Sequence, residues 1–152
     1  MDGNPLYTPR ELEHRLKDSG AGAIVILENF AGTLEQVLSK TPVKHVVMAT
    51  MGDLLGFKGL IVNFVVRKVK KLVPAFNVPG AVPFNTVISE GAGMQWKKVE
   101  VGPDDIAFLQ YTGGTTGVSK GAILLHRNII ANMEQVSAWF SPTRREDDPL
   151  VM

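Results

Sequence analysis

The residues best suited to chemistry lie in one short stretch, YTGGTTGVSKGAILLH, at positions 111–126. Its first eleven residues include four glycines, which let successive backbone N–H groups turn towards a bound anion without a side chain in the way. Hydrogen bonds to a charged group contribute about 1.5–3 kcal/mol each, so such a loop would hold a polyphosphate firmly. The side-chain donors are Thr112, Thr115, Thr116, Ser119 and Lys120.

Spacing separates this stretch from the common nucleotide-binding loops. Gly113 and Gly117 are one residue closer than the Walker pattern G-x-x-x-x-G-K-[ST] requires, and two residues separate Gly117 from Lys120. A Walker loop also opens a helix, whereas an apolar run typical of a strand follows Lys120. The dinucleotide pattern G-x-G-x-x-G does not occur here, and the protein-kinase loop lacks a clustered threonine pair. The spacing therefore indicates a phosphate-binding loop of another kind.

The flanking sequence predicts the elements that hold this loop. Residues 105–111 and 121–125 are short apolar runs, so the loop joins one predicted strand to another. His126 lies at the start of a predicted helix that covers residues 129–140. The apolar positions of this helix, at helical spacing, are Ile129, Ile130, Met133, Val136 and Phe140.

The N-terminal part alternates helix and strand signals. Thr8 is a good N-cap, and Pro9 and Glu11 suit the first turn of a helix over residues 8–18 that turns Leu12 and Leu16 towards a core. Gly20 would end this helix. The further predicted elements are a buried strand at 23–27, a short helix at 33–38 and a second strand at 44–50. This alternation predicts a parallel sheet covered by helices.

Residues 59–73 have the pattern of an amphipathic helix. One predicted face carries Val62, Val65, Val66, Val69 and Val73, and the other carries Asn63, Arg67, Lys70 and Lys71. The favoured interpretation is a helix packed on its own core with solvated lysines. The alternative is peripheral contact with an anionic membrane surface through the basic face. Residues 74–105 are predicted to be loops, with a helical turn at 84–89.

Composition limits the classes of function. The chain has 152 residues, 45% of them hydrophobic, and a net charge of only +1, so no global field would attract nucleic acid. It has no cysteine, which excludes disulfides and a thiol nucleophile. The N-terminus lacks an apolar signal-peptide core, and no apolar run has the length of a membrane span. We expect a cytoplasmic protein, with peripheral contact at the inner membrane as the alternative.

The run LQYTGGTTGVSKG resembles the phosphate-binding signature of the adenylate-forming superfamily, which includes acyl-CoA synthetases, peptide-synthetase adenylation domains and luciferases. Two further stretches, NPLYTPRELEHRLKDSGA and NFVVRKVKKLVPAFNVPGAVPF, are similar to bacterial long-chain fatty-acid–CoA ligases of the FadD type. The resemblance covers nearly the whole chain. It implies a partial N-terminal AMP-binding domain of α/β class over 1–152. Its parts would be α/β units at 1–58, an amphipathic helix at 59–73, loops at 74–105 and the phosphate-loop unit at 106–140.

The resemblance also implies a reaction and roles for residues. ATP, Mg²⁺ and coenzyme A would convert a long-chain fatty acid to an acyl-adenylate and then to a thioester. The hydroxyls and amides of the loop would contact the β- and γ-phosphates, and Lys120 would neutralise the departing pyrophosphate. Tyr111 suits packing better than catalysis, and Ser119 is a weaker candidate because proline or alanine is commoner there in the family. The implied binding segment is Tyr111, Thr112, Gly113, Gly114, Thr115, Thr116, Gly117, Val118, Ser119, Lys120, Gly121 and Ala122.

Other parts of the family's machinery have no counterpart in these 152 residues. They are the Tyr-Gly-x-Thr-Glu motif that helps to hold magnesium, the aspartate that binds the ribose and the lysine of the C-terminal domain. We therefore assign no catalytic residue and no metal ligand, and expect a fragment that is inactive alone and self-associates through uncovered apolar faces. The alternative is a non-catalytic nucleotide-binding or interaction module.

Overall fold

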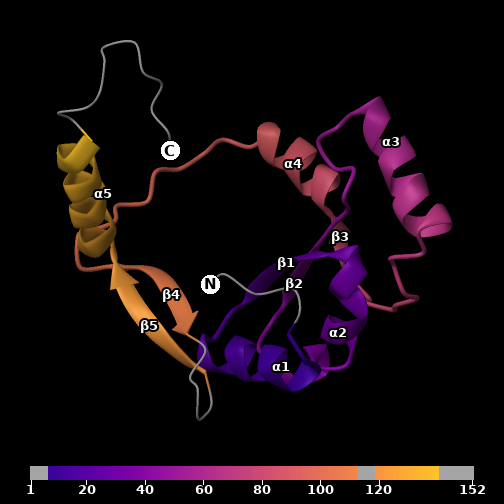
Figure 1. Cartoon of the computed structure of the whole chain (residues 1–152), viewed down its shortest axis with the longest axis horizontal. Coiled ribbons are helices and arrows are strands. Elements are labelled where there is room, and N and C mark those ends of the chain that lie inside the picture. The colour runs from indigo at the N-terminus through magenta and orange to yellow at the C-terminus, as the bar shows by residue number, and fades with distance from the viewer. Residues whose placement is uncertain (1–6, 113–118, 141–152) are drawn as a thin grey trace. The chain divides into compact units, whose positions relative to one another are not determined.

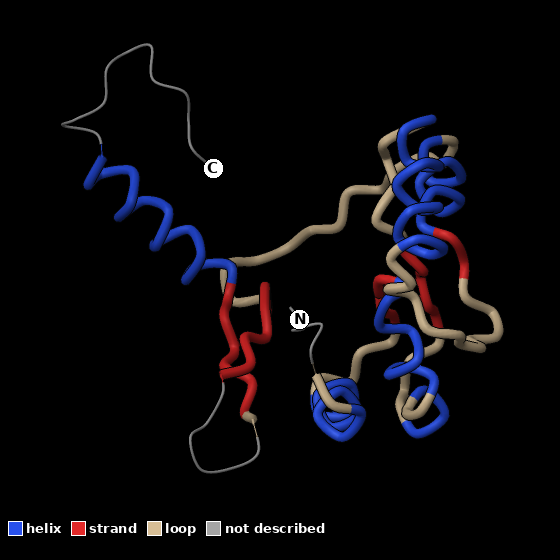
Figure 2. The backbone as a smooth tube through the Cα atoms, turned by 45° about the vertical axis from the view of Figure 1, so that its right-hand side comes forward, coloured by secondary structure: helices blue, strands red, loops and turns tan. Residues whose placement is uncertain are grey.

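The computed structural model describes residues 7–112 and 119–140. The chain divides into two units, one formed by Gly3–Lys97 and one whose described part begins at Lys98. Helices and strands of both units are shown in Figure 1, and Figure 2 shows the same backbone by secondary structure. Each unit is described by itself.

Helix α1 (Pro9–Asp18) forms as predicted, because its local signals agree. Glu11 donates its backbone N–H to the Thr8 hydroxyl, and its carboxylate accepts from the backbone N–H of Thr8 at 2.8 Å, which makes a capping box. Gly20 follows the helix with φ of 64°, a conformation that suits glycine. Leu12 and Leu16 are buried, as predicted.

Strands β1 (Ala23–Leu27), β2 (His45–Ala49) and β3 (Val82–Pro83) form a parallel sheet in the order β1-β2-β3. The connection from β1 to β2 contains the 3₁₀ turn η1 (Glu28–Phe30), helix α2 (Ala31–Glu35) and a second 3₁₀ turn, η2 (Leu38–Lys40). This connection replaces the single helix predicted at 33–38. The parallel sheet with covering helices is confirmed. Its core joins both helices to the sheet through Leu12, Leu16, Ala31, Leu34, Val37, Val46 and Val78.

The prediction that 23–27 is a fully buried strand is wrong for one face. Ile24 and Ile26 pack against the core, but Val25 points the other way and is 62% exposed. Successive side chains of a strand point to opposite faces, so helices on one side cover only alternate residues.

The predicted amphipathic helix at 59–73 is shifted and shorter. Helix α3 (Phe57–Phe64) continues into the π-helical segment η3 (Val65–Val69). Val66 is buried, whereas Val69 is exposed, so the valine face is only partly turned inward. The predicted solvent face is also wrong at Asn63, which is half-buried and makes the side-chain hydrogen bonds described below. Arg67 is exposed, as predicted, but it also pairs with Glu28.

A close backbone approach positions the start of α3. A Cβ atom built on Gly59 would lie 2.0 Å from the carbonyl oxygen of Gly52, and one on Gly52 would lie 2.2 Å from that of Gly59. No side chain fits at such a distance, so glycine at both positions allows α3 to pack against the turn after β2. This contact is not visible in the apolar periodicity of residues 59–73, and it helps to explain why the helix begins earlier than predicted.

Residues 74–105 are not all loop. They contain β3, which adds the third strand to the sheet, and helix α4 (Phe84–Ala92), which packs against β2 and β3. The predicted helical turn at 84–89 is therefore the first part of a nine-residue helix.

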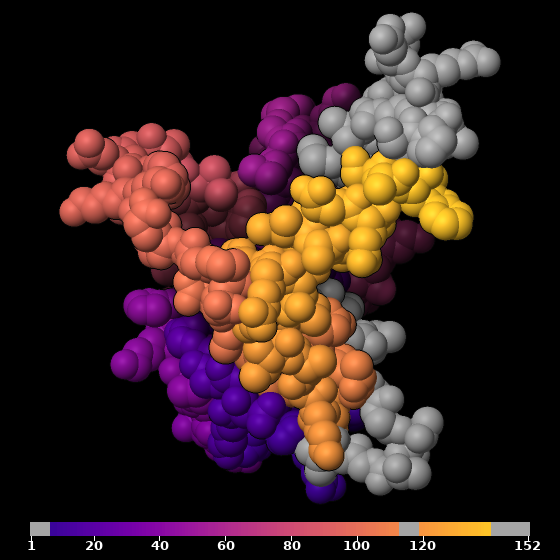
Figure 3. Space-filling model, turned by 90° about the vertical axis from the view of Figure 1, so that its left-hand side faces the viewer, coloured from indigo at the N-terminus to yellow at the C-terminus, as the bar shows by residue number. Residues whose placement is uncertain are grey.

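The second unit confirms the predicted strands around the loop. Strand β4 (Ile106–Thr112) pairs antiparallel with β5 (Lys120–Leu125), and helix α5 (His126–Phe140) follows directly. The helix begins three residues before its predicted start at 129. The space-filling view of Figure 3 shows α5 in yellow. Its apolar stripe is exposed within the described residues, and comprises Ile130, Met133, Val136 and Phe140.

Candidate phosphate-binding site

The β4–β5 hairpin brings two predicted phosphate contacts together. Thr112 and Lys120 are direct partners at the end of the antiparallel ladder, and both are exposed. Directly opposite residues of such a pair have Cβ atoms about 4.5–5.5 Å apart, so one anionic group can approach both side chains. The hairpin thus places a hydroxyl donor beside a cation. The remaining six loop residues lie outside the described part of the chain: Gly113, Gly114, Thr115, Thr116, Gly117 and Val118.

Tyr111 and Gly121 form the next cross-strand pair, one residue further from the loop, and they pack against each other. Tyr111 is 7% exposed, and its ring lies so close that a Cβ atom on Gly121 would be 3.1 Å from the ring carbon Cζ. An aromatic ring over a cross-strand glycine covers the exposed backbone and strengthens the pair. This placement agrees with the expected packing role of Tyr111. Ala122, the last residue of the predicted binding segment, is exposed and pairs with Gln110.

Ser119 has a definite hydrogen bond that the sequence did not predict. Its hydroxyl donates to the backbone carbonyl of Thr112 at 3.0 Å. The bond crosses between the two ends of the loop, one residue beyond the last pair of the ladder. The residue type at position 119 could have indicated this bond, because the family resemblance implies proline or alanine there and only serine has a hydroxyl to donate.

The N-terminus of α5 uses its backbone N–H groups within the protein. The N–H of His126 donates to the carbonyl of Asp105 at 3.0 Å, and that of Arg127 donates to the carbonyl of Pro103 at 2.9 Å. Asn128 also accepts from the backbone N–H of Leu125 at 2.9 Å. His126 is therefore a helix-start residue, as predicted, and its N–H is already hydrogen-bonded within the protein.

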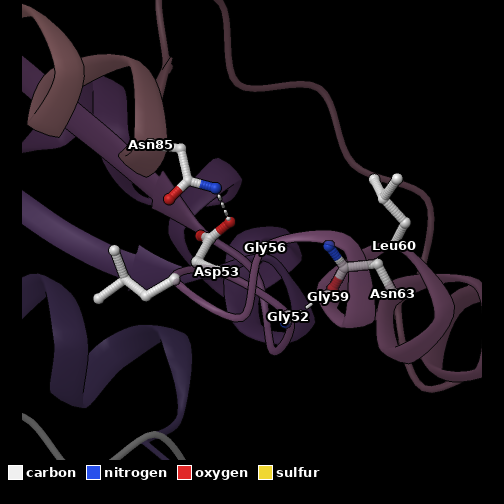
Figure 4. Close-up of a pocket in the computed structure, with 8 residues that line it drawn as sticks. Gly52, Asp53, Gly56, Gly59, Leu60, Asn63 and Asn85 are labelled. Atoms are coloured by element: carbon white, nitrogen blue, oxygen red, sulfur yellow. Dashed lines mark hydrogen bonds between the residues drawn. The ribbon is translucent and has the colours of Figure 1, made fainter.

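A polar hollow in the first unit was missed from the sequence. It lies after the carboxyl end of β2, between the turn that follows this strand and helices α3 and α4 (Figure 4). Asp53 accepts from the backbone N–H of Thr50 at 2.6 Å and from the side-chain amide of Asn85 at 2.9 Å. Asn63 accepts from the N–H of Gly52 at 2.8 Å and donates to the Thr50 hydroxyl at 2.9 Å. These groups bond one another, so the hollow is a junction that ties both helices to the sheet.

An ion pair between the buried Glu28 and the half-exposed Arg67 fixes the segment η3 that follows α3. Glu28 is 3% exposed, and Arg67 donates to it from Nε at 3.0 Å and from Nη2 at 2.7 Å. These hydrogen bonds raise the pKa of Arg67 above its ordinary value. Arg67 therefore anchors η3 to η1 while its side chain stays about half exposed.

The described residues form neither a metal cluster nor a membrane-spanning helix. Across residues 7–112 and 119–140, no group of three or more His, Asp or Glu side chains is placed to hold a metal ion. In the same part of the chain, no helix combines the length and apolar character needed to cross a membrane.

Residues 3–152 match the family described as AMP-binding enzymes. The chain belongs to this AMP-binding enzyme family.

Individual relatives are ligases. The chain is 57% identical to a long-chain-fatty-acid–CoA ligase of Escherichia coli O6:H1 over 150 residues, which is 98% of this chain and 27% of the relative. It is 59% identical to the ligase of the same description from Haemophilus influenzae over 87% of this chain and 24% of the relative. A Bacillus subtilis protein of that description is 32% identical over 90% of this chain and 24% of the relative. The chain thus spans about a quarter of the length of these relatives.

Proposed function

We propose that this chain supplies part of the ATP phosphate site of a long-chain fatty-acid–CoA ligase. The observation that carries the proposal is the pairing of Thr112 with Lys120 at the end of the β4–β5 hairpin. Membership of the AMP-binding enzyme family and similarity to long-chain-fatty-acid–CoA ligases support it.

The proposed reaction has two steps. A fatty-acid carboxylate oxygen attacks the α-phosphorus of ATP, and the bond to pyrophosphate breaks to leave an acyl-adenylate. The thiol of coenzyme A, which loses its proton, then attacks the acyl carbonyl and AMP leaves. Lys120 and Thr112 would stabilise negative charge that accumulates on the departing pyrophosphate, because fixed donors act most strongly where charge develops. Mg²⁺ would arrive with the ATP phosphates, and the other catalytic groups would come from outside this chain.

The proposal is tested in the full ligase by fatty-acid-dependent exchange of pyrophosphate into ATP. We expect Lys120→Ala combined with Thr115→Ala to abolish the exchange, and Lys120→Ala alone to reduce it by at least about tenfold, the effect of losing one charge-assisted bond in the transition state. Lys97→Ala is a matched control, since this exposed lysine lies in the first unit. Unchanged exchange in the double variant would contradict the assigned roles.

A non-catalytic role for the 152-residue chain is the alternative. Calorimetry of this chain with ATP and AMP, with and without Mg²⁺, distinguishes the two. Tight magnesium-dependent binding would support a nucleotide-binding module, whereas we expect weak or no binding because one hairpin supplies only part of a site.

We also propose peripheral contact between this protein and an anionic membrane surface, such as the inner membrane. The surface concerned is the outer face of α3, where Phe57, Leu60, Ile61 and Phe64 recur at helical spacing and each is more than half exposed. Between Asp53 and Glu90 the sequence contains five cations and no acid. An apolar stripe beside basic residues is the pattern of a helix that lies in a membrane interface. The membrane-contacting surface would therefore include residues before 59. It would be a different apolar face from the valine face predicted for residues 59–73.

Flotation with phosphatidylcholine vesicles, with and without phosphatidylglycerol, tests this contact. We expect binding only to the anionic vesicles, and a loss of binding in the triple variant Lys68→Glu, Lys70→Glu, Lys71→Glu, because each basic residue near such a surface contributes about 1 kcal/mol. The triple variant Arg10→Glu, Lys44→Glu, Lys97→Glu, at exposed positions away from α3, is the control with the same change in net charge. Equal binding to both kinds of vesicle, or by the triple variant, would argue against the contact.

A further inference from the structure

We propose that Ser119 is a positioning residue that holds Thr112 and Lys120 side by side. This inference rests on the proposed function, in which those two residues contact the phosphates of ATP. The bond concerned is the one from the Ser119 hydroxyl to the Thr112 carbonyl at 3.0 Å.

The location of this bond gives it an effect on both residues. Within the described residues, the β4–β5 ladder ends at the pair of Thr112 and Lys120, and the end pairs of a ladder open more readily than its central pairs. Ser119 directly precedes Lys120, so its side-chain bond adds one further link beyond the ladder. The link restrains the backbone carbonyl of Thr112 and the backbone next to Lys120 at the same time.

Packing below the pair provides support from the other side. The Tyr111 ring lies on Gly121, so the pair of Thr112 and Lys120 lies between a packed aromatic contact and the Ser119 hydrogen bond. Side chains that must meet a ligand in a fixed geometry need such restraint, because freedom lost on binding weakens affinity. An alanine or proline at position 119 has no hydroxyl and cannot make this bond.

The expected effect is on ATP binding and on the adenylate-forming step in which Thr112 and Lys120 act, and not on thioester formation. Loss of one ordinary hydrogen bond changes an equilibrium by about twofold to tenfold, so Ser119→Ala should raise the KM for ATP by that factor. The KM for fatty acid and for coenzyme A should stay the same, because Ser119 acts only through Thr112 and Lys120. The conservative variant Ser119→Thr keeps a hydroxyl and should restore the KM for ATP.

The experiment measures steady-state kinetics of the full ligase with each substrate varied in turn. Ser89→Ala is a matched control, because the Ser89 hydroxyl also donates to a backbone carbonyl, that of Thr86 at 2.9 Å in α4. A KM for ATP that rises in Ser119→Ala, recovers in Ser119→Thr and stays unchanged in Ser89→Ala would support the inference.

Three results would overturn it: an unchanged KM for ATP in Ser119→Ala, an equal rise in Ser89→Ala, or no recovery in Ser119→Thr. Each leaves the wild-type ligase activity, and hence the proposed function, intact. A wild-type protein without fatty-acid-dependent ATP–pyrophosphate exchange would instead overturn the proposed function, and the inference with it.

Discussion

At the scale of single residues, the hairpin depends on what fits between neighbouring strands. Gly121 is the clearest case, since an added Cβ atom would press on the buried Tyr111 ring. We expect Gly121→Ala to lower the free energy of unfolding by about 1–3 kcal/mol, because the ring must move to admit a methyl group. Thermal denaturation followed by near-UV circular dichroism measures this. Gly22→Ala is the control, as nothing lies within 4 Å of its added Cβ atom, and an equal loss there would contradict the steric explanation.

The pair of Glu28 and Arg67 gives a second prediction at this scale. Arg67→Met would leave the Glu28 carboxylate buried without its cation, which costs about 3–5 kcal/mol for a fully buried pair and less here because Arg67 is half exposed. Adding Glu28→Gln should recover most of the stability, because the buried charge is then absent. Urea denaturation of the single and double variants measures both effects. A double variant as unstable as the single one would contradict a role for the charge.

At the scale of elements, the capping box of α1 predicts that part of the protein's stability depends on pH. The pKa of Glu11 is lowered, chiefly by the hydrogen bond it accepts from the backbone N–H of Thr8 and then by that from the Thr8 hydroxyl. A carboxylate whose pKa is lowered by folding stabilises the fold above its unfolded pKa, and this contribution is lost as the pH falls through the folded value. We expect Glu11→Gln to lower the melting temperature at neutral pH, and the difference from the wild type to shrink as the pH falls below the ordinary carboxyl range and through the lowered pKa of Glu11. A difference independent of pH would exclude the charged capping box.

A substitution at the N-terminus of α5 is predicted to stabilise the second unit. Asn128 accepts from the backbone N–H of Leu125, but Leu125 has no side-chain acceptor to give in return. Leu125→Thr should complete a reciprocal cap and stabilise the unit by about 0.5–1 kcal/mol, if the loss of leucine contact is small at this half-buried position. The measurement is thermal denaturation, and Leu125→Ala is the control that removes the leucine without adding an acceptor. A threonine variant no more stable than the alanine variant would contradict the capping explanation.

Local signals explain which elements could be predicted from the sequence. The bounds of α1 and β1, and the two strands around the loop, follow from caps and short apolar runs that need no distant partner. Helix α3 was misplaced because its start depends on the contact between Gly52 and Gly59, and the ion pair of Arg67 was missed because its partner, Glu28, is 39 residues away. The Ser119 bond was missed for the same reason, since its partner is seven residues away across a loop.

At the scale of the whole molecule, the uncovered apolar surface leads to a prediction about assembly. The stripe on α5 and the outward residues of the hairpin, among them Phe108 and Ile123, are about half exposed or more. Exposed apolar faces and open strand edges favour association with other chains. We expect the 152-residue chain alone to form oligomers whose mass increases with concentration in light scattering. A monodisperse monomer across that range would contradict this, and Met133→Lys with Val136→Lys should reduce the association.

The bulge in β4 has a consequence for how the loop end of the hairpin is aligned. Ile106 pairs with Leu125 and Phe108 with Leu124, so two steps along β4 match one step along β5. A slip of one residue would turn every side chain of a strand to the opposite face and could bring Tyr111 opposite Lys120 in place of Thr112. The irregular pairing cannot shift without being rebuilt, so it helps to fix the register of the hairpin. The alignment of Thr112 with Lys120 is thus set in part at the opposite end of the hairpin, and under the proposed function a deletion of Ala107, which removes the bulge, would alter the binding of ATP.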